Sequence, residues 1–448
     1  MIGAAKSRYF LMAFLVSVFF LAHHKIAAIE PRSPRLVRAG ADRIAEATES
    51  GNVYRQIALW ALGGVSTVLL LTRRGLRIRA NGLLGWLLLA YFAWCALSLV
   101  WSDEPALTFR RLVAYSMVCL GALATSSRFS QKDLVSLSFY GCSAYLLAGL
   151  AVQVLQGQFT PLAEGFRFSG TVVPNHQGWN IGLLLIAGCA LAAAGHRRRP
   201  VLFMWLAVAG VLLVLTKSRS AVFSAVISLV YFFGSRLPAR RLAVVLMIAT
   251  SASLFLALVF GPNLSSNLSH LALLGRGDEA SAETLTGRTP VWRECMVYAV
   301  ERPFHGFGFN SFWTPKRVVD ISARARWAVP GAHNGYLELV LGLGIVGLAL
   351  YVAILGGALG KAWVRARQSG DATIRFQVST LVFFSLVMAL EEIATSVTLE
   401  NFVVLTLLVG EGLSKSIDAS PRPVEARSSR RLRGTTHGPV AESGRESA

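Results

Sequence analysis

The residues best suited to chemistry in this sequence are cations that stand beside long apolar segments. Guanidinium groups stay protonated and bind phosphate oxygens in a fixed forked geometry. Arg288 also opens a predicted amphipathic helix, whose free backbone N–H groups favour the same anions. The outward cations Arg167, Lys217, Arg219 and Arg288 therefore indicate an anion site, and Arg288 is the one best placed for phosphate oxygens.

Each of these cations also has a simpler interpretation. Lys217 and Arg219 lie in a short turn between two apolar segments, where long basic side chains can reach lipid headgroups. Arg167 on its own is an ordinary loop arginine, and Arg288 could form an ion pair with a nearby glutamate. The sequence leaves these alternatives open.

A histidine offers base chemistry at the start of another apolar segment. His333 stands in Ala-His-Asn-Gly-Tyr-Leu-Glu, where Asn334 and Glu338 are possible supporting residues. An unperturbed histidine pKa of about 6.5 suits a general base near neutral pH. A lone histidine at a helix start is, however, more often a cap or an interfacial residue.

Acidic residues near the apolar segments provide competing candidates. Ionisable groups inside membrane spans are costly and often functional. The simpler interpretation is that the glutamates pair with Arg110 and Arg111. The candidates are Asp103 and Glu104 in a short loop, and Glu338, Glu391 and Glu392 within predicted spans.

The composition shows what must position these groups. Hydrophobic residues make up 54% of the chain and charged residues 15%, whereas soluble domains carry about a quarter charged residues. Continuous apolar runs of roughly 17 to 25 residues cross a membrane as helices. We expect an all-α integral membrane protein with about twelve spans, near residues 9–29, 56–72, 82–101, 108–124, 134–155, 176–195, 201–216, 218–234, 241–261, 333–359, 375–393 and 397–414.

The net charge of +20 is spread over short clusters between apolar segments, which favours membrane topology over nucleic-acid binding. The bias of lysine and arginine toward alternate loops predicts that both termini are cytoplasmic. Residues 30–55 disagree, because they place five arginines on the outer side. The predicted organisation is spans 1–9 in residues 1–261, an outer loop forming a small helical cap in 262–332, spans 10–12 in 333–418, and a disordered cytoplasmic tail in 419–448.

Four sequence segments together resemble the bacterial O-antigen ligase family, which includes O-antigen and exopolysaccharide polymerases. They are TKSRSA around Arg219, GRTPVW around Arg288, RPFHGFGFNSF, and HNGYLELVLGLGIVG. The last is the most specific, with His333-Asn334, nine residues, Gly344, two residues and Gly347. At motif level the resemblance covers about residues 165 to 350.

The resemblance implies a metal-independent, cofactor-free and inverting glycosyltransferase of the bacterial inner membrane. Its donor would be a glycan on undecaprenyl diphosphate, and its acceptor lipid A-core or another glycan on the periplasmic face. Arg167, Arg219 and Arg288 would hold the diphosphate, and His333 would assist attack by the acceptor hydroxyl. Lys217, Asn334 and Glu338 would support them.

Three questions stay open at this level. A ligase and a polymerase need the same donor site, so the motifs do not separate them. A transporter or flippase of lipid-linked glycan is the alternative from another class, although it would need charges along a path at mid-membrane. The sequence does not indicate which sugars are transferred or what the oligomeric state is.

Overall fold

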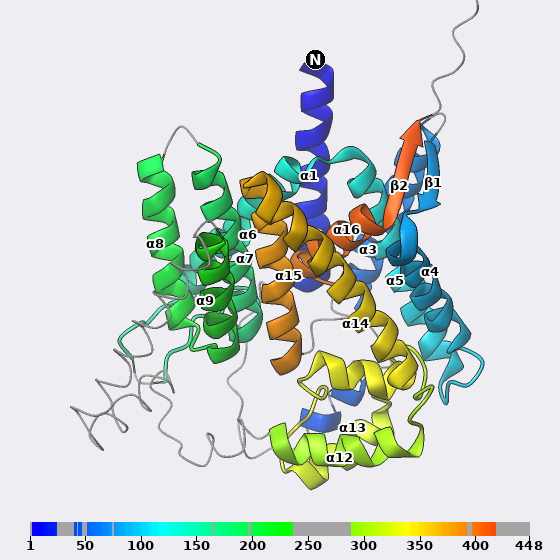
Figure 1. Cartoon of the computed structure of the whole chain (residues 1–448). Coiled ribbons are helices and arrows are strands. Elements are labelled where there is room, and N and C mark those ends of the chain that lie inside the picture. Colours follow the sequence, from blue (N-terminus) through cyan, green and yellow to red (C-terminus); the bar gives the residue numbers. More distant parts are fainter. Residues whose placement is uncertain are drawn as a thin grey trace, which may run out of the picture.

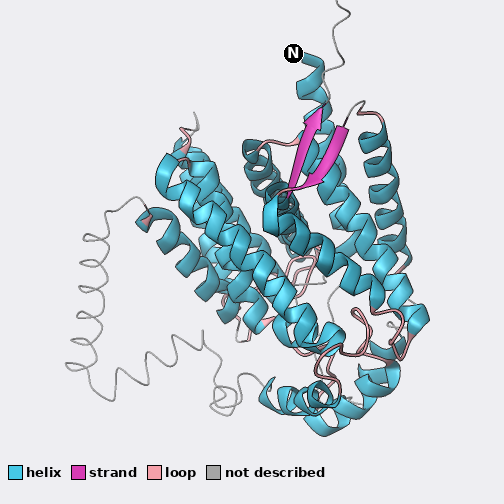
Figure 2. Cartoon of the chain, turned by 45° about the vertical axis from the view of Figure 1, so that its right-hand side comes forward, coloured by secondary structure: helices cyan, strands magenta, loops and turns pink. Residues whose placement is uncertain are grey.

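The computed structural model describes residues 2–24, 40–42, 44–46, 52–73, 76–163, 165–195, 199–235, 288–391 and 397–417. These residues form a helical bundle with a small cap at one end and a two-stranded ribbon at the other (Figures 1 and 2). The main helices are α1 (Ile2–His23), α3 (Val53–Leu71), α4 (Gly82–Leu97), α5 (Pro105–Arg128), α6 (Gln131–Leu155), α7 (Pro174–Ala193), α8 (Arg199–Leu215), α9 (Arg219–Gly234), α12 (Arg288–Glu301), α13 (Pro315–Ala325), α14 (Gly335–Ser369), α15 (Ala372–Leu390) and α16 (Leu399–Gly412).

Length and composition identify candidate membrane-spanning helices. Within the described residues, six helices are long and apolar enough to span a bilayer, namely α3, α5, α6, α7, α14 and α15. Apolar stretches in α1, α4, α8 and α9 are shorter. Large apolar side chains such as Trp60 and Leu71 are mostly exposed, as expected for helices that face lipid rather than water. The chain is a multi-pass membrane protein.

Eleven of the twelve predicted spans coincide with helices of the described residues. The ninth, at 241–261, lies outside them, as do residues 262–287 of the predicted cap and the tail from 419. Because six helices meet the length criterion, the total of twelve spans stays a prediction. Helix α14 runs ten residues past the predicted end of its span and stops at Gly370, whose φ of +62° closes the helix.

The expectation of an all-helical chain was wrong in one detail. Strands β1 (Leu76–Ala80) and β2 (Leu413–Ile417) pair in antiparallel register, with Leu76 opposite Ile417. This ribbon joins the segment after α3 to the segment after α16, so both lie at the same end of the bundle (Figure 2).

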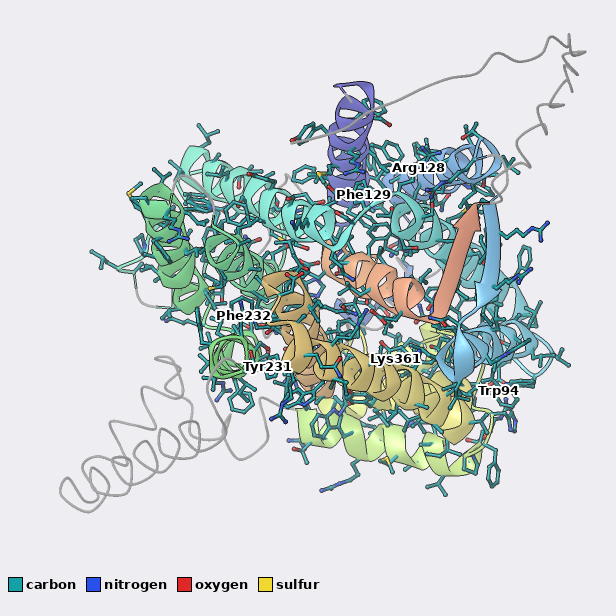
Figure 3. The ribbon with its side chains drawn as sticks, turned by 45° about the horizontal axis from the view of Figure 1, so that its top comes forward. Trp94, Arg128, Phe129, Tyr231, Phe232 and Lys361 are labelled. Carbon is teal, nitrogen blue, oxygen red and sulfur yellow. The ribbon has the colours of Figure 1, made fainter. Side chains whose placement is uncertain are left out.

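Other loops predicted to share a side meet at this ribbon end. Arg128, labelled in Figure 3 beside Phe129 at the end of α5, donates from Nη2 to the carbonyl oxygen of Leu69 at 2.8 Å. Arg8 of α1 lies 3.4 Å from the carboxylate of Asp133 at the start of α6. These contacts agree with the predicted alternation of loops. That this end faces the cytoplasm stays a prediction.

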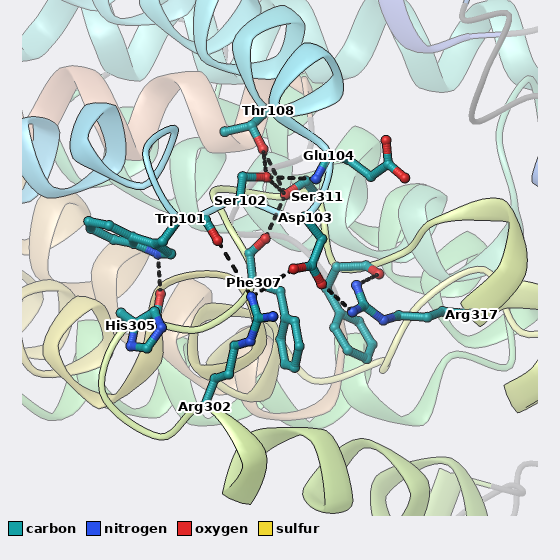
Figure 4. A network of polar contacts seen from close by, with 11 residues as sticks. Trp101, Ser102, Asp103, Glu104, Thr108, Arg302, His305, Phe307, Ser311 and Arg317 are labelled. Carbon is teal, nitrogen blue, oxygen red and sulfur yellow. Dashed lines mark hydrogen bonds and ion pairs between the residues drawn. The ribbon is translucent and has the colours of Figure 1, made fainter.

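The opposite end carries the cap, whose described part contains α12 and α13 around a separate apolar core that includes Val291, Phe307 and Ile321. The loop between α4 and α5 holds the cap in place, as Figure 4 shows. Asp103 in this loop accepts from Arg302 at 2.8 Å and from Arg317 at 2.6 Å.

A glycine turn of the cap packs into a kink of α14. The N–H of Phe307 donates to the carbonyl oxygen of Leu341 at 2.9 Å, and Gly308 repeats this contact with Gly342 at 2.9 Å. The kink lies at Gly344, where φ is +69° and an added Cβ would overlap the backbone of Phe304. This joint fixes the first turns of α14, which follow His333.

Candidate active site

Several of the predicted residues converge on one buried carboxylate at the capped end of the bundle. Glu391 ends α15 and is 3% exposed. Its Oε1 atom accepts hydrogen bonds from Arg288 at 2.6 Å, Asn175 at 2.8 Å and Ser220 at 3.3 Å. A buried carboxylate requires such donors, because an unpaired one would be strongly destabilising. Glu391 therefore holds α7, α9, α12 and α15 together. We call Glu391, its three donors and the neighbouring Arg167, Arg219 and His333 the Glu391 cluster.

Arg288 enters this cluster as the first residue of α12. Its side chain is 15% exposed and forms an ion pair with Glu391. The alternative considered from the sequence, an ion pair with a glutamate, is thus confirmed. The sequence did not indicate that the glutamate would be 103 residues away.

Arg167 reaches the cluster through a second residue. Its Nη2 donates to Oδ1 of Asn175 at 3.0 Å, and its Nε donates to the carbonyl oxygen of Thr216 at 3.0 Å. Asn175 passes the connection on to Glu391 through its own amide. Arg167 therefore links the start of α7 to the turn before α9, which is more than an ordinary loop arginine does.

His333 lies beside the same carboxylate. Its Nδ1 is 3.6 Å from Oε2 of Glu391, and its side chain is 18% exposed. The ring stacks on Trp327 with centroids 5.5 Å apart and an interplanar angle of 21°. His333 has φ of +51°, a left-handed conformation that a non-glycine residue rarely adopts. The next residue, Asn334, caps α14 by accepting from the N–H groups of Tyr336 and Leu337.

The first residue of α9 and the turn before it supply two more cations. Arg219 is half-buried and close enough to Arg288 for their charges to interact. Its neighbour Ser220 donates to Glu391, so the start of α9 is part of the cluster. Lys217 lies in the turn before α9, where it is half-buried and has φ of +50°. None of the contacts described for Glu391 comes from Lys217.

The other acidic candidates lie elsewhere. Glu338 accepts from Nε1 of Trp313 at 2.7 Å and from the N–H of Ala332 at 2.6 Å, and its charge interacts with Arg111. The predicted arginine pairing therefore holds in part for Glu338 and was wrong for Glu391, which pairs with Arg288. Glu392 lies outside the described residues.

Asp103 fastens the cap rather than joining the Glu391 cluster. Burial raises the pKa of its carboxyl, but the hydrogen bonds and charges of Arg317 and Arg302 outweigh this and hold the pKa below its ordinary value. Its neighbour Glu104 precedes α5 and donates its backbone N–H to Ser102.

Sequence reasoning missed the residues that connect the cluster. Asn175 and Ser220 were not singled out, although each adjoins a segment that was. His176 follows Asn175, and its Nδ1 lies 2.6 Å from Nε2 of His23 in α1. The ring of His176 also stacks on Trp179, with centroids 4.1 Å apart. Small polar residues are common at the starts of helices, so the sequence alone does not show that Asn175 and Ser220 contact a buried carboxylate.

The cluster is suited to an anion and to proton transfer. Arg167, Arg219 and Arg288 together with the single carboxylate of Glu391 leave an excess of positive charge, which favours phosphate oxygens. His333 beside a fixed carboxylate is the arrangement that sets an imidazole in one tautomer. In the described residues, no three or more His, Cys, Asp or Glu side chains form a group that could hold a metal ion. Independence from metal stays a prediction of the resemblance.

Comparison with known proteins identifies the same region. Residues 202–352 match the family model for O-antigen ligase. The chain is also 23% identical over 315 residues to exopolysaccharide production protein ExoQ of Rhizobium meliloti (strain 1021), an alignment that covers 66% of this chain and 69% of that protein. The domain match contains Arg219, Arg288 and His333. Residues 202–352 of this multi-pass membrane protein therefore match the O-antigen ligase domain, and the chain is distantly homologous to the exopolysaccharide production protein ExoQ.

Proposed function

We propose that this chain transfers a glycan from undecaprenyl diphosphate to an acceptor hydroxyl at the capped end of the bundle, on the periplasmic face of the inner membrane. One observation carries the proposal. Arg288 and His333 meet on the buried carboxylate of Glu391, so an anion-binding group and a base share one site.

The arginines serve the donor in this proposal. Breaking the bond between the anomeric carbon and the diphosphate oxygen leaves charge on the leaving group, and fixed guanidinium groups stabilise it. Arg288 has five N–H donors, and its ion pair with Glu391 uses Nη2. The same side chain can therefore hold Glu391 and a phosphate oxygen together. Arg167 and Arg219 hold the remaining oxygens.

His333 serves the acceptor. Glu391 lies on the Nδ1 side of the ring, so a proton on Nδ1 faces the carboxylate and the Nε2 lone pair is left for the acceptor hydroxyl. The hydroxyl oxygen bonds to the anomeric carbon as its proton passes to Nε2, and undecaprenyl diphosphate leaves. Attack from the face opposite the leaving group inverts the anomeric centre, and neither metal nor cofactor takes part.

Two acceptors fit this chemistry. A ligase passes a finished chain to lipid A-core, which is the function we favour from the domain match. A polymerase passes a growing chain to a new repeat unit, and the similarity to a protein named for exopolysaccharide production favours this second candidate.

Mass analysis of undecaprenyl-diphosphate-linked glycans in a strain lacking the gene separates the two. Long chains that accumulate on the carrier lipid indicate ligation, and single repeat units that accumulate indicate polymerisation. An unchanged profile would count against both and would favour the transporter alternative. Against that alternative, Glu391 at the end of α15 pairs with Arg288 of the cap helix α12, so the cluster lies at the capped end of the bundle; Figure 1 shows α12 at that end.

A further inference from the structure

A second cavity is lined by residues other than those of the Glu391 cluster. This cavity of about 700 Å³ is lined by residues of α3, α4, α5, α14 and α16 and of the cap. Arg167, Arg288, His333 and Glu391 are not among its lining residues. The segment before α14 contacts both sites, because its Pro330 lines the cavity and its Trp327 stacks on His333.

Three arginines gather at the mouth of this cavity. Arg55 lies in the first turn of α3, and Arg110 and Arg111 lie in the second turn of α5. Arg55 and Arg110 are exposed, Arg111 is half-buried, and the charges of all three interact. The positive ends of the two helix dipoles add to this field.

One glutamate opposes the three arginines. Glu338 is the only acidic residue among the described lining residues, which leaves an excess of two positive charges. Its Oε1 atom already accepts from Trp313 and from the backbone N–H of Ala332. Those two donors hold the carboxylate against the cap.

Away from the arginines, the cavity is lined mainly by apolar side chains, with the tyrosines Tyr91, Tyr115 and Tyr351 among them. From Arg111 to Val118 the wall follows α5 for seven residues, or about 10 Å at 1.5 Å per residue. Aliphatic and sulfur-containing side chains of α3, α5 and α16 line this part, among them Leu59, Met117, Leu405 and Leu408. Ligand cavities of about 300 to 1,000 Å³ take organic molecules of moderate size.

We propose that this cavity binds a lipid that carries a phosphate headgroup, with the phosphate on Arg55, Arg110 and Arg111 and a hydrocarbon chain between α5 and α16. The three arginines favour a lipid with a negative headgroup over a neutral lipid. The apolar wall along α5 favours a molecule with a hydrocarbon chain over a soluble anion. A membrane phospholipid and a polyprenyl phosphate share this chemistry. The site is distinct from the Glu391 cluster and does not depend on the reaction proposed there.

Native mass spectrometry of the detergent-purified full chain provides the test. The probes are phosphatidylglycerol, undecaprenyl phosphate and, as the uncharged reference, undecaprenol. We expect both phosphate lipids to bind at least about tenfold more tightly than undecaprenol, the order of effect of one or two charge-assisted hydrogen bonds. Stronger binding of undecaprenyl phosphate than of phosphatidylglycerol would identify the occupant as a carrier lipid, and equal binding would identify it as bulk phospholipid.

Variants locate the binding to this cavity. Arg110→Gln combined with Arg111→Gln should weaken phosphate-lipid binding about tenfold, whereas the double lysine variant should retain most of it. Arg293→Gln removes an exposed arginine on the cap outside the cavity and should change nothing. Ala114→Phe fills the apolar part without altering charge, and should also reduce binding.

Equal binding of undecaprenol and undecaprenyl phosphate would overturn the proposal. So would unchanged phosphate-lipid binding in the double glutamine variant or in Ala114→Phe. Thermal unfolding of each variant, measured in the same detergent, shows that a lost signal reflects the site and not the fold.

Discussion

Replacing Glu391 with glutamine removes the charge at the centre of the site while keeping a side chain of the same shape. Arg288, Asn175 and Ser220 can still donate to the new carbonyl oxygen. What is lost is the counter-charge of Arg288 and the carboxylate 3.6 Å from Nδ1 of His333.

The contacts set the size of both effects. Removing one member of a buried ion pair costs about 3 to 5 kcal/mol. The cost here should be nearer about 2 kcal/mol, because the amide retains an acceptor and Arg288 is 15% exposed. Transfer activity should fall by about 10² or more, the usual contribution of a correctly oriented general base.

Glu411→Gln is the matched control. Glu411 is also a buried glutamate that accepts from an arginine and an amide, Arg365 and Gln377, but it lies at the ribbon end of the bundle. Donor turnover and thermal unfolding should be measured on both variants. We expect similar losses of stability and a loss of activity for Glu391→Gln alone. Full activity of Glu391→Gln, or equal inactivation of Glu411→Gln, would refute the assigned role.

Three further predictions concern the cap and α14. Asp103→Asn should lower cap stability by about 1 kcal/mol at pH 7; because the folded pKa of Asp103 is depressed, this difference should disappear as pH falls below the ordinary value of 3.8, and its persistence in unfolding curves at low pH would contradict the ion-pair account. Gly344→Ala should prevent accumulation of folded protein, because the residue has φ of +69° and abuts backbone, whereas Gly356→Ala in the same helix meets open space and should be harmless; fluorescence-detected size exclusion compares them. Asn334→Ala should cost about 1 kcal/mol in thermal unfolding and Asn334→Asp much less, because only the latter retains the N-cap acceptor; equal losses would argue against capping.

The apolar segments could be located from the sequence because the membrane leaves little choice. A backbone in lipid must satisfy its own hydrogen bonds, so continuous apolar runs become helices. The end of α14 was less predictable, since its last turns contain Lys361, Arg365 and Arg367 and continue beyond the apolar stretch. The ribbon was missed because β1 is a five-residue segment whose partner follows more than 300 residues later.

The sequence predicted several of the residues that form the site, but not which of them contact one another. The residue types of Arg288 and His333 indicated phosphate binding and base chemistry, and the structure brings both to one place. Their shared partner, Glu391, was assigned to other arginines because sequence distance carries no information on how α12 and α15 pack. The polar links through Asn175 and Ser220 depend on the same packing.

Donor turnover by purified protein tests the central claim most directly. The full chain in proteoliposomes is supplied with an undecaprenyl-diphosphate-linked glycan and an acceptor, and mass spectrometry follows the released undecaprenyl diphosphate. We predict release by the wild-type protein and its loss in His333→Ala and in Arg288→Ala, with both variants still folded. Full activity of both variants, or binding of the donor without its consumption by the wild type, would contradict the proposed glycosyl transfer.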